Sequence, residues 1–369
     1  MRIAINCRSI LLSQRTGIGR YTYHLIDALG RIDPANDYIL HAPKGIFDFK
    51  RRLPDFSDYK NLQRYPDYFN QGISRYDVYH FPCPDEMGTF SGKLVVTIHD
   101  LIYKAYPQAH TPQTIALTEK FMQGIAAKAD QIICISENTR RDLHRYFDIP
   151  EAKSTVVYNG VDHTMFYPLS DQQRQQAQED LKNQLGIMGP FMLFVGTIEP
   201  RKNLGGLLEA FALLKSKKIF EGQLVIAGME GWMMQGLGEL VQRLNIEQDI
   251  LFAGFVSDVQ LRQLYNRAEI FVFPSLYEGF GFPILEAFCC GAAVVTSSTS
   301  SCGEVAADAA LAVDPQDPKA MAEAMERILT DATFKASLQQ AGLKRAQEFS
   351  FEKTARNTLD VYRRLVNHA

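Results

Sequence analysis

Two adjacent cations, Arg201 and Lys202, lie between the apolar run Phe191–Val195 and an amphipathic helical pattern. Arg presents a planar fork of donors to phosphate oxygens, and Lys presents a compact point charge. Because cations are ordinarily unfavourable at the start of a helix, their position indicates that an anion binds there. The loop, which also contains Gly196, therefore predicts a cradle for a diphosphate. The simpler interpretation is a solvated basic pair held by Glu199.

A second loop of this kind carries two carboxylates. An apolar run ends at Pro274, a glycine-rich loop follows, and a helix is expected from Pro283. The free N–H groups of such a loop and of the helix start can bind an anion or hydroxyl groups. Glu278 in the loop and Glu286 in the first helical turn are expected to face the same cleft. The simpler interpretation is that Glu286 complements the helix dipole and Glu278 is solvated.

Three further segments carry weaker signals. Gly17 and Gly19 form a Gly-x-Gly loop before a helix expected at Tyr21–Leu29, and the third glycine of a dinucleotide fingerprint is absent. His99 directly follows an apolar strand, where it is either a ligand-facing group or a satisfied structural histidine. Asn159-Gly160 is first of all a turn signal.

The elements that must position these residues form two series of short apolar runs alternating with longer amphipathic stretches. The first series is Ile3–Asn6, Tyr38–His41, Val78–Phe81, Leu94–Ile98, Gln131–Ile135 and Thr155–Tyr158. The second is Phe191–Val195, Gln223–Ala227, Ile250–Phe252, Ile270–Phe273, Ala293–Thr296 and Leu311–Val313. Continuous apolar strands separated by helices indicate parallel sheets covered on both faces. The fold class is therefore α/β with two doubly wound domains, divided near residue 168.

Composition narrows the class of protein. The chain has 369 residues, 46% of them hydrophobic and 22% charged, as in an ordinary globular protein of two domains. A net charge of -3 gives no reason to expect nucleic-acid binding. The six cysteines form no Cys-x-x-Cys pair and are expected to be buried free thiols in a reducing compartment. With no signal-peptide core and no run long enough to span a bilayer, the protein is expected in the cytoplasm, either free or peripheral on the inner face of the membrane.

Taken together, these segments resemble glycosyltransferase family 4, a retaining family with the GT-B fold of two Rossmann-like domains facing a cleft. The motifs follow one another along nearly the whole chain: Gly17-x-Gly19, His99-Asp100, Ser136-Glu137, Asn159-Gly160-Val161-Asp162, Glu199-x-Arg201-Lys202-Asn203, and Glu278 with Glu286 as Glu-x7-Glu. The most specific run is EGFGFPILEAFCCGAAVVTS. It departs from the family at Phe288-Cys289-Cys290, where smaller residues are usual, and this is expected to affect packing only.

The resemblance implies a role for each catalytic or donor-binding residue. Arg201 and Lys202 would hold the donor diphosphate and neutralise the leaving nucleoside diphosphate, beside Gly196. Glu278 would bind hydroxyls of the donor sugar, and Glu286 would accept from the ribose hydroxyls. The remaining contacts implied are the backbone N–H groups of Phe280, Gly281 and Phe282 at the sugar, the loop of Gly17 and Gly19 at the diphosphate, and His99 over the sugar near the reacting carbon.

It also implies how the chain is divided. Residues 1–168, together with a terminal helix at 351–369, would form an N-terminal domain that binds the acceptor. Residues 169–350 would form the C-terminal domain that binds the nucleotide sugar. No Asp-x-Asp or Asp/His cluster occurs on a strand-end loop, so neither a metal nor another cofactor is expected. Front-face displacement assisted by the donor's own phosphate is the mechanistic hypothesis.

The opening of the chain looks most like bacterial mannosyltransferases of surface-polysaccharide and lipopolysaccharide biosynthesis. GDP-mannose is therefore the first expectation for the donor, with UDP-sugars as the alternative, and the acceptor would be a glycan or a lipid-linked oligosaccharide. Membrane contact through Arg140, Arg141 and Arg145 is weighed against a solvated helix face. Other classes that such a fold allows are a sugar-nucleotide epimerase, a phosphorylase and a catalytically inactive binding subunit.

Overall fold

The computed structural model describes residues 1–11, 17–41, 53–65, 76–83, 92–229 and 236–367. The chain forms two compact units, one of Met1–Gly160 with Ser350–Ala369 and the other of Val161–Phe349. The first crossing between the units thus lies eight residues before the expected position at 168. Residues after the crossing are tied into the second unit, because the Asn266 side chain accepts from the Leu169 N–H and donates to the Tyr167 carbonyl.

The first unit contains a parallel sheet of seven strands in the order β3-β2-β1-β4-β5-β6-β7. Its strands are β1 (Arg2–Asn6), β2 (Asp37–His41), β3 (Leu62–Tyr65), β4 (Val78–Phe81), β5 (Lys93–Ile98), β6 (Gln131–Cys134) and β7 (Ser154–Val156). Six of them were expected from the apolar runs. The seventh, β3, has the sequence Leu-Gln-Arg-Tyr and lies at the edge of the sheet, where the polar face of a strand needs no apolar cover.

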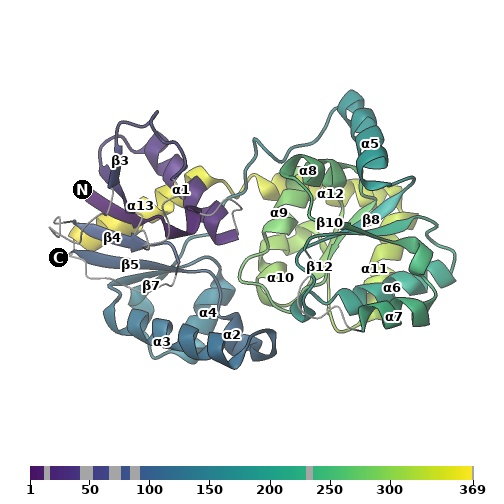
Figure 1. Cartoon of the computed structure of the whole chain (residues 1–369), viewed down its shortest axis with the longest axis horizontal. Coiled ribbons are helices and arrows are strands. Elements are labelled where there is room, and N and C mark those ends of the chain that lie inside the picture. Colours follow the sequence, from purple (N-terminus) through teal and green to yellow (C-terminus); the bar gives the residue numbers. More distant parts are fainter. Residues whose placement is uncertain (12–16, 42–52, 66–75, 84–91, 230–235, 368–369) are drawn as a thin grey trace. The chain divides into compact units, whose positions relative to one another are not determined.

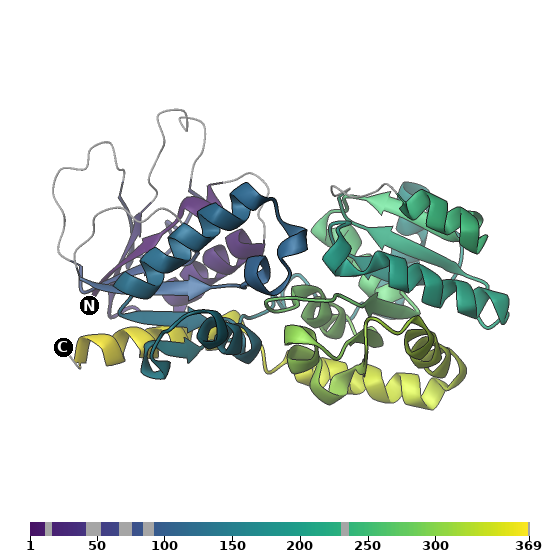
Figure 2. The same ribbon diagram turned by 90° about the horizontal axis from the view of Figure 1, so that it is seen from below.

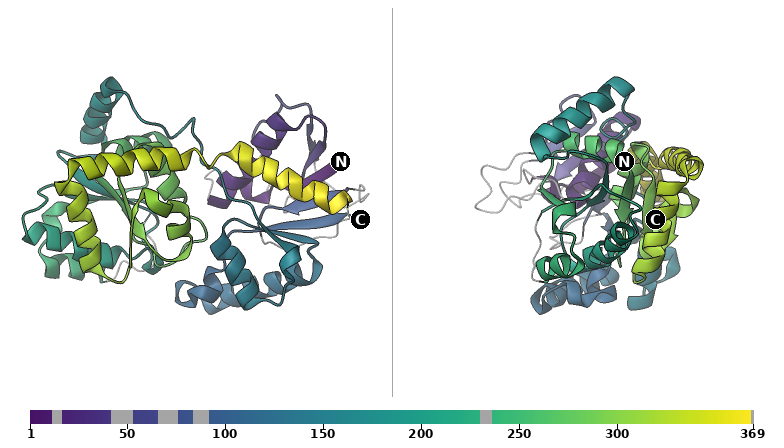
Figure 3. Two further views of the ribbon diagram at one scale, coloured as in Figure 1. Left: turned by 180° about the vertical axis from the view of Figure 1, so that it is seen from behind. Right: turned by 90° about the vertical axis from the view of Figure 1, so that its right-hand side faces the viewer.

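Helices cover both faces of this sheet (Figures 1 and 2). They are α1 (Gly17–Ile32), α2 (Ile102–Ala105), α3 (Pro112–Lys128), α4 (Glu137–Tyr146) and α13 (Phe351–Asn367). Alternate residues of β1 face opposite ways: Ile3 and Ile5 join the core beneath α1 and α13, whereas Ala4 joins the core on the other face. This two-sided burial explains the continuous apolar runs. The terminal helix α13 packs against α1 (Figure 3).

The second unit contains a parallel sheet of six strands in the order β10-β9-β8-β11-β12-β13. The strands are β8 (Phe191–Val195), β9 (Gln223–Ala227), β10 (Ile250–Gly254), β11 (Ile270–Phe273), β12 (Val294–Ser297) and β13 (Leu311–Val313). All six correspond to the expected runs. The order reverses between β8 and β11, which are neighbours in space although β9 and β10 lie between them in the chain.

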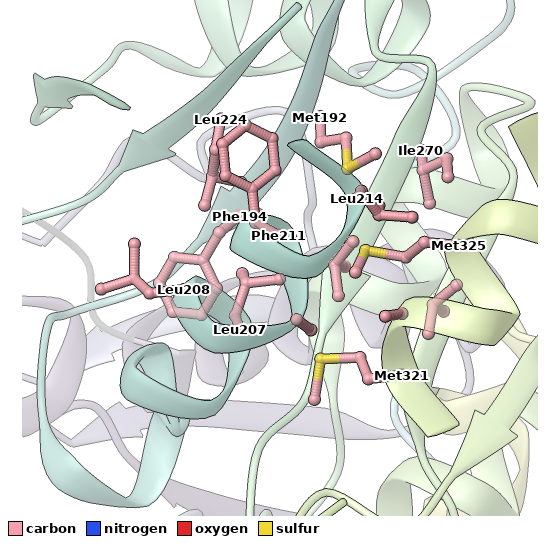
Figure 4. Close-up of a cluster of buried hydrophobic side chains, with 14 of the residues drawn as sticks. Met192, Phe194, Leu207, Leu208, Phe211, Leu214, Leu224, Ile270, Met321 and Met325 are labelled. Carbon is pink, nitrogen blue, oxygen red and sulfur yellow. The ribbon is translucent and has the colours of Figure 1, made fainter. Parts of the chain in front are cut away.

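The helices of the second unit are α5 (Asp171–Leu185), α6 (Leu204–Ser216), α7 (Leu237–Leu244), α8 (Asp258–Arg267), α9 (Phe282–Cys289), α10 (Ser300–Ala306), α11 (Pro318–Thr330) and α12 (Ala332–Ala346). The helices α6, α7 and α11 cover one face of the sheet, and α8, α9 and α12 cover the other (Figure 1). Figure 4 shows the core of the first of these faces, where side chains of β8, α6 and α11 meet: Met192, Phe194, Leu207, Leu208, Phe211, Met321 and Met325.

The cysteines were expected to be buried free thiols. All six cysteines are free thiols, and five of them are buried. Phe288, Cys289 and Cys290 lie at the end of α9 and are each at most 4% exposed, so the departure from the family pattern is in the core. Among the described helices, no segment has the length and hydrophobicity needed to cross a membrane.

Candidate active site

The two loops singled out in the sequence meet at one edge of the second sheet. One follows β8 and contains a 3-10 turn at Pro200–Lys202, and the other follows β11 and leads into α9. Because β8 and β11 are adjacent parallel strands, their carboxyl ends lie side by side. The order of strands reverses at this point, and such a switch point is where open α/β sheets bind ligands.

The centre of the site is the carboxylate of Glu278, held between two cations. Glu278 Oε1 lies 2.5 Å from Lys202 Nζ, and Oε2 lies 2.8 Å from Arg201 Nη1. The other end of the guanidinium contacts Glu199 at 2.6 Å. The Lys202 and Glu278 side chains are only 10% and 11% exposed. The Arg201–Glu199 pair of the simpler interpretation is thus present, but it is one part of a shielded four-residue cluster.

Electrostatics keep this cluster ionised. Burial alone would raise the pKa of Glu278, but the charges of Lys202 and Arg201 and the hydrogen bonds from Lys202 and Ser275 outweigh it and lower that pKa below its ordinary value. Two carboxylates and two cations leave the cluster without net charge. Lys202 Nζ also lies 4.8 Å from the centre of the Phe273 ring, a cation–π contact. An arriving anion would therefore have to compete with Glu278 for both cations.

Backbone bonds join the two loops directly. The Leu276 N–H donates to the Arg201 carbonyl at 2.7 Å, and Arg201 Nη1 donates to the Tyr277 carbonyl at 3.1 Å. The Ser275 hydroxyl lies 2.6 Å from Glu278 Oε1 and 3.0 Å from the Arg201 carbonyl, so it has one hydrogen for two close acceptors. The position of the carboxylate is thereby coupled to the backbone that carries the cations.

Sequence reasoning missed a set of hydroxyl groups that fasten the Glu278 loop from its other side. The Ser301 hydroxyl donates to the Glu278 carbonyl at 2.8 Å, and the Ser300 hydroxyl accepts from the Glu278 N–H at 3.1 Å. The Ser297 hydroxyl donates to the Ser275 carbonyl at 2.5 Å. The sequence contains these residues as a run of Ser and Thr from the end of β12, the strand next to β11, into α10.

Two glycines permit the local backbone. Gly196 directly follows β8 with φ of 151°, and a Cβ there would point at the Lys202 side chain, 3.6 Å from its Cε. Gly281 is the N-cap of α9 with φ of 113°. Both angles lie in the region that favours glycine. At Gly281 the left-handed turn sets the direction in which α9 leaves the loop.

Glu286 lies in α9 but one turn later than expected. The helix begins at Phe282, so Glu286 is in its second turn and is too far from the helix start to serve mainly as a dipole partner. It is 6% exposed, and one carboxylate oxygen accepts a hydrogen bond from the Tyr265 hydroxyl at 3.1 Å. The side chain is therefore a buried acceptor anchored by α8.

Phe280, Gly281 and Phe282, which were expected to contact the donor sugar, lie at the end of this loop and at the start of α9. Phe280 is buried and packs edge-on against Phe282, with ring centres 5.3 Å apart. Phe282 is the first residue of α9, and the N–H groups of a first helical turn have no acceptor inside the helix. Together with Gly281, these residues join the loop that carries Glu278 to α9.

Asn203 lies at the N-cap position of α6, where its side chain makes no capping hydrogen bond. Its side-chain amide donates to the Pro315 carbonyl at 2.6 Å. Gly17 and Gly19 were expected in a loop before a helix at Tyr21. The helix α1 instead includes both of them, beginning at Gly17, so the prediction of a Gly-x-Gly loop is wrong.

His99 follows β5 in the first unit and is 7% exposed. Its Nε2 lies 2.6 Å from the Pro82 carbonyl oxygen, which only accepts, so Nε2 carries the hydrogen and Nδ1 has the free lone pair. Burial lowers the pKa of His99 below its ordinary value, against the opposing effects of the Pro82 carbonyl and the Asp100 charge. The imidazole is therefore neutral at physiological pH, with a defined tautomer.

The second unit thus brings together Arg201, Lys202 and Glu278 in direct contact, with Gly196 beside them. His99, Gly17 and Gly19 belong to the first unit. In the parts of the chain that the structure describes, no three His, Cys, Asp or Glu side chains are grouped to hold a metal ion.

Comparison with known proteins covers both units. Residues 15–164 match the family described as Glycosyltransferase Family 4, and residues 177–345 match the family described as Glycosyl transferases group 1. O-antigen chain mannosyltransferase B of Escherichia coli is 34% identical over 273 residues, which are 74% of this chain and 71% of that protein. Serotype-specific mannosyltransferase WbdA of Escherichia coli is 30% identical over 278 residues, 74% of this chain but only 34% of WbdA.

Among solved structures, Anabaena Alr3699/HepE in complex with UDP and glucose superimposes with a TM-score of 0.71 over 98% of this chain and 99% of that one, at 17% identity. This similarity shows the fold, which is GT-B with its two parallel α/β sheets. Sequence matches in both units and a relative at 34% identity lead to one conclusion: the chain belongs to glycosyltransferase family 4.

Proposed function

We propose that this glycosyltransferase transfers mannose from GDP-mannose to a glycan or lipid-linked oligosaccharide, with retention of anomeric configuration and without a metal ion. The observation that carries the proposal is the pair of cations on a buried carboxylate at the switch point of the second sheet. The mannosyltransferase names of the two Escherichia coli relatives support the choice of sugar.

In this proposal the donor diphosphate binds Arg201 and Lys202, which neutralise the charge that develops on the leaving group. Glu278 then exchanges its ion pairs for hydrogen bonds to sugar hydroxyls, and the N–H groups of Phe280, Gly281 and Phe282 orient the sugar. Glu286 accepts from the ribose hydroxyls. Its bond to the Tyr265 hydroxyl holds the carboxylate in place at the buried side of α9.

His99 would lie over the donor sugar, supplied by the first unit. A neutral imidazole with hydrogen on Nε2 offers Nδ1 as an acceptor for a sugar hydroxyl. Gly17 and Gly19, now assigned to the first turn of α1, would contribute helical N–H groups toward the diphosphate. We infer a front-face displacement in which the donor phosphate takes the acceptor's proton. Trapping of a covalent glycosyl-enzyme would overturn that inference.

A thermal-shift panel of nucleoside diphosphates and sugar nucleotides in EDTA tests the donor. A ligand at about 100 times its Kd stabilises the native state by about 2.7 kcal/mol, which raises the Tm of a unit of this size by roughly 5–10 °C. Selective stabilisation by GDP and GDP-mannose is expected. No response to any nucleotide, or a response only with Mg²⁺, would refute the metal-free diphosphate site.

A UDP-sugar is the second candidate donor. It is favoured by the structural neighbour from Anabaena, which was solved with UDP and glucose. Selective stabilisation of this chain by UDP compounds would retain the enzyme class and replace the donor.

The acceptor is proposed to bind the first unit, in the cytoplasm at the inner face of the membrane. Arg140 is an unsuitable membrane contact, because its guanidinium donates to the Ser154 hydroxyl and pairs with Glu137 and Glu151. Arg141 and Arg145 remain candidates. Neutralising both is expected to reduce sedimentation with anionic vesicles, and unchanged sedimentation would remove the proposed membrane contact.

A further inference from the structure

A chain of buried polar groups runs through the first unit between its sheet and the two helices on one face. His80 Nδ1 lies 2.6 Å from the Tyr362 hydroxyl, and His80 Nε2 lies 2.8 Å from the Thr97 hydroxyl. The Thr97 hydroxyl in turn lies 3.1 Å from the Tyr21 hydroxyl. All four side chains are 0% exposed. They come from four separate elements: α13, β4, β5 and α1.

The donor and acceptor roles of these four side chains are coupled through His80. Burial lowers the pKa of His80 to about 3, with a smaller contribution from the nearby His99, so His80 is neutral. A neutral imidazole donates from one nitrogen and accepts at the other. If Tyr362 donates to Nδ1, then Nε2 donates to Thr97, whose hydroxyl can either donate to Tyr21 or accept from it. If Nδ1 donates to Tyr362 instead, Thr97 donates to Nε2 and accepts from Tyr21. In either case His80 couples the roles of Tyr362 and Thr97, and a missing member leaves a buried polar group unpaired.

The last member of this series of buried polar groups, Tyr21, contacts His99. The Tyr21 and His99 rings meet edge to face, with centres 4.9 Å apart and planes at 81°. The opposite constraint on His99 is the hydrogen bond from Nε2 to the Pro82 carbonyl. The edge-to-face contact with Tyr21 and the hydrogen bond to the Pro82 carbonyl together fix the orientation of the His99 ring. Its remaining nitrogen, Nδ1, is thereby aimed in one direction.

We propose that Tyr21 is a positioning residue for His99, and that Thr97, His80 and Tyr362 hold Tyr21 in place. The Tyr362 hydroxyl of the terminal helix α13 thus helps to position His99, although the two residues are far apart in the sequence. The inference rests on the proposed role of His99 at the donor sugar. Its structural half, the orientation and tautomer of His99, stands independently of which donor the enzyme uses.

The test uses the full-length protein with ¹⁵N-labelled histidine and the variant Tyr362→Phe, which removes only the far end of the chain. The His99 signals are identified by their loss in a His99→Gln variant. Wild-type His99 is expected to give the pattern of a neutral ring with hydrogen on Nε2. In Tyr362→Phe its ring ¹⁵N signals are expected to shift toward a mixture of tautomers. Because misplacement of a reacting group costs rate, kcat is expected to fall about tenfold with the donor KM within about twofold.

The matched control is Tyr38→Phe. Tyr38 is another fully buried tyrosine of the first unit, and its hydroxyl donates to Asp33 at 2.6 Å, outside the chain of polar groups. The control is expected to leave the His99 signals and kcat unchanged. Tyr21→Leu, which removes the ring contact itself, is expected to exceed Tyr362→Phe in both effects.

The proposal is overturned if Tyr362→Phe changes the His80 signals while those of His99 stay at their wild-type positions. It is equally overturned if Tyr38→Phe alters His99 as strongly, because the effect would then be general loosening of the unit. Should the wild type transfer no sugar from any tested donor, the proposed function fails, and the His99 signals still decide the positioning proposal.

Discussion

Replacing Glu278 by Gln is expected to weaken catalysis and to strengthen the binding of nucleoside diphosphate. In the unliganded protein this carboxylate already contacts Lys202 Nζ at 2.5 Å and Arg201 Nη1 at 2.8 Å. A diphosphate that binds the same cations must displace it or share them with it. The neutral amide introduced by the substitution would compete far less and would leave the cluster with a net positive charge.

The magnitude follows from the bonds that are lost. A hydrogen bond to a charged group contributes about 1.5–3 kcal/mol net, so the competing carboxylate is worth at least one such bond to an incoming anion. The Kd of the nucleoside diphosphate is therefore expected to fall by roughly 10- to 150-fold. Removing one partner of a buried ion pair also costs stability, here about 3 kcal/mol in the unliganded variant. The apparent Tm should fall by roughly 5–10 °C.

Isothermal titration with GDP and UDP in EDTA measures the affinity, and donor turnover is measured on the same preparations. The matched control is Glu269→Gln, the same substitution in an ion pair with Lys335 in the second unit. Glu269 precedes β11 whereas Glu278 follows it, so the two carboxylates lie at opposite edges of the sheet. The control is expected to leave diphosphate affinity unchanged. Equal or weaker binding by Glu278→Gln would refute the idea that the carboxylate competes with the ligand.

Three further predictions concern the groups around the site and the packing of the first unit. Gly160→Ala would place a Cβ 2.2 Å from a backbone nitrogen of α13 and is expected to lower the free energy of unfolding in urea by about 3 kcal/mol. In the control Gly189→Ala, which has open space around it, the loss should be less than about 1 kcal/mol. Equal losses would show that the close approach at Gly160 is absent. Ser301→Ala removes the buried donor to the Glu278 carbonyl and is expected to lower kcat about tenfold. The control Ser216→Ala, which loses a similar bond at an exposed helix end, should leave kcat unchanged. If both variants are fully active, the hydrogen bond from Ser301 has no role in catalysis. Because the folded-state pKa of Glu278 is lowered, its contribution to stability is present above the pKa of the unfolded chain, about 4.3, and is lost as the pH falls through the folded value. Wild type should therefore lose more stability than Glu278→Gln on acidification below about pH 4, and parallel curves would contradict the shift.

Regular structure was largely predictable because most strands are buried on both faces and so form continuous apolar runs. The exceptions have identifiable causes. The edge strand β3 is half polar, and α5 buries only Ala177 and Leu181, too few to form a periodic stripe. Its boundaries were nevertheless present in the sequence as a capping box at Ser170 and Gln173 and a left-handed Gly186.

The site was predictable as residue types at strand ends but not as contacts. Arg201, Lys202 and Glu278 could be assigned to loops after β8 and β11. That Glu278 pairs with both cations follows only from the adjacency of these two strands, whose loops are 76 residues apart in the chain. The buried chain from Tyr362 to Tyr21 depends likewise on helix packing that no local pattern specifies.

The first unit is built from two segments at opposite ends of the sequence, and this affects how it folds during translation. Residues 350–369 complete a unit that begins at Met1, so its sheet emerges from the ribosome long before its last helix does. At 5–20 residues per second, translation of the intervening second unit takes roughly 10–40 s. During that time the face destined for α13 has no cover, and His80 lacks its Tyr362 partner. Chains truncated after Phe349 and released from the ribosome are therefore expected to contain a protease-resistant second unit and a protease-sensitive first one, a reversal of the usual order of cotranslational folding.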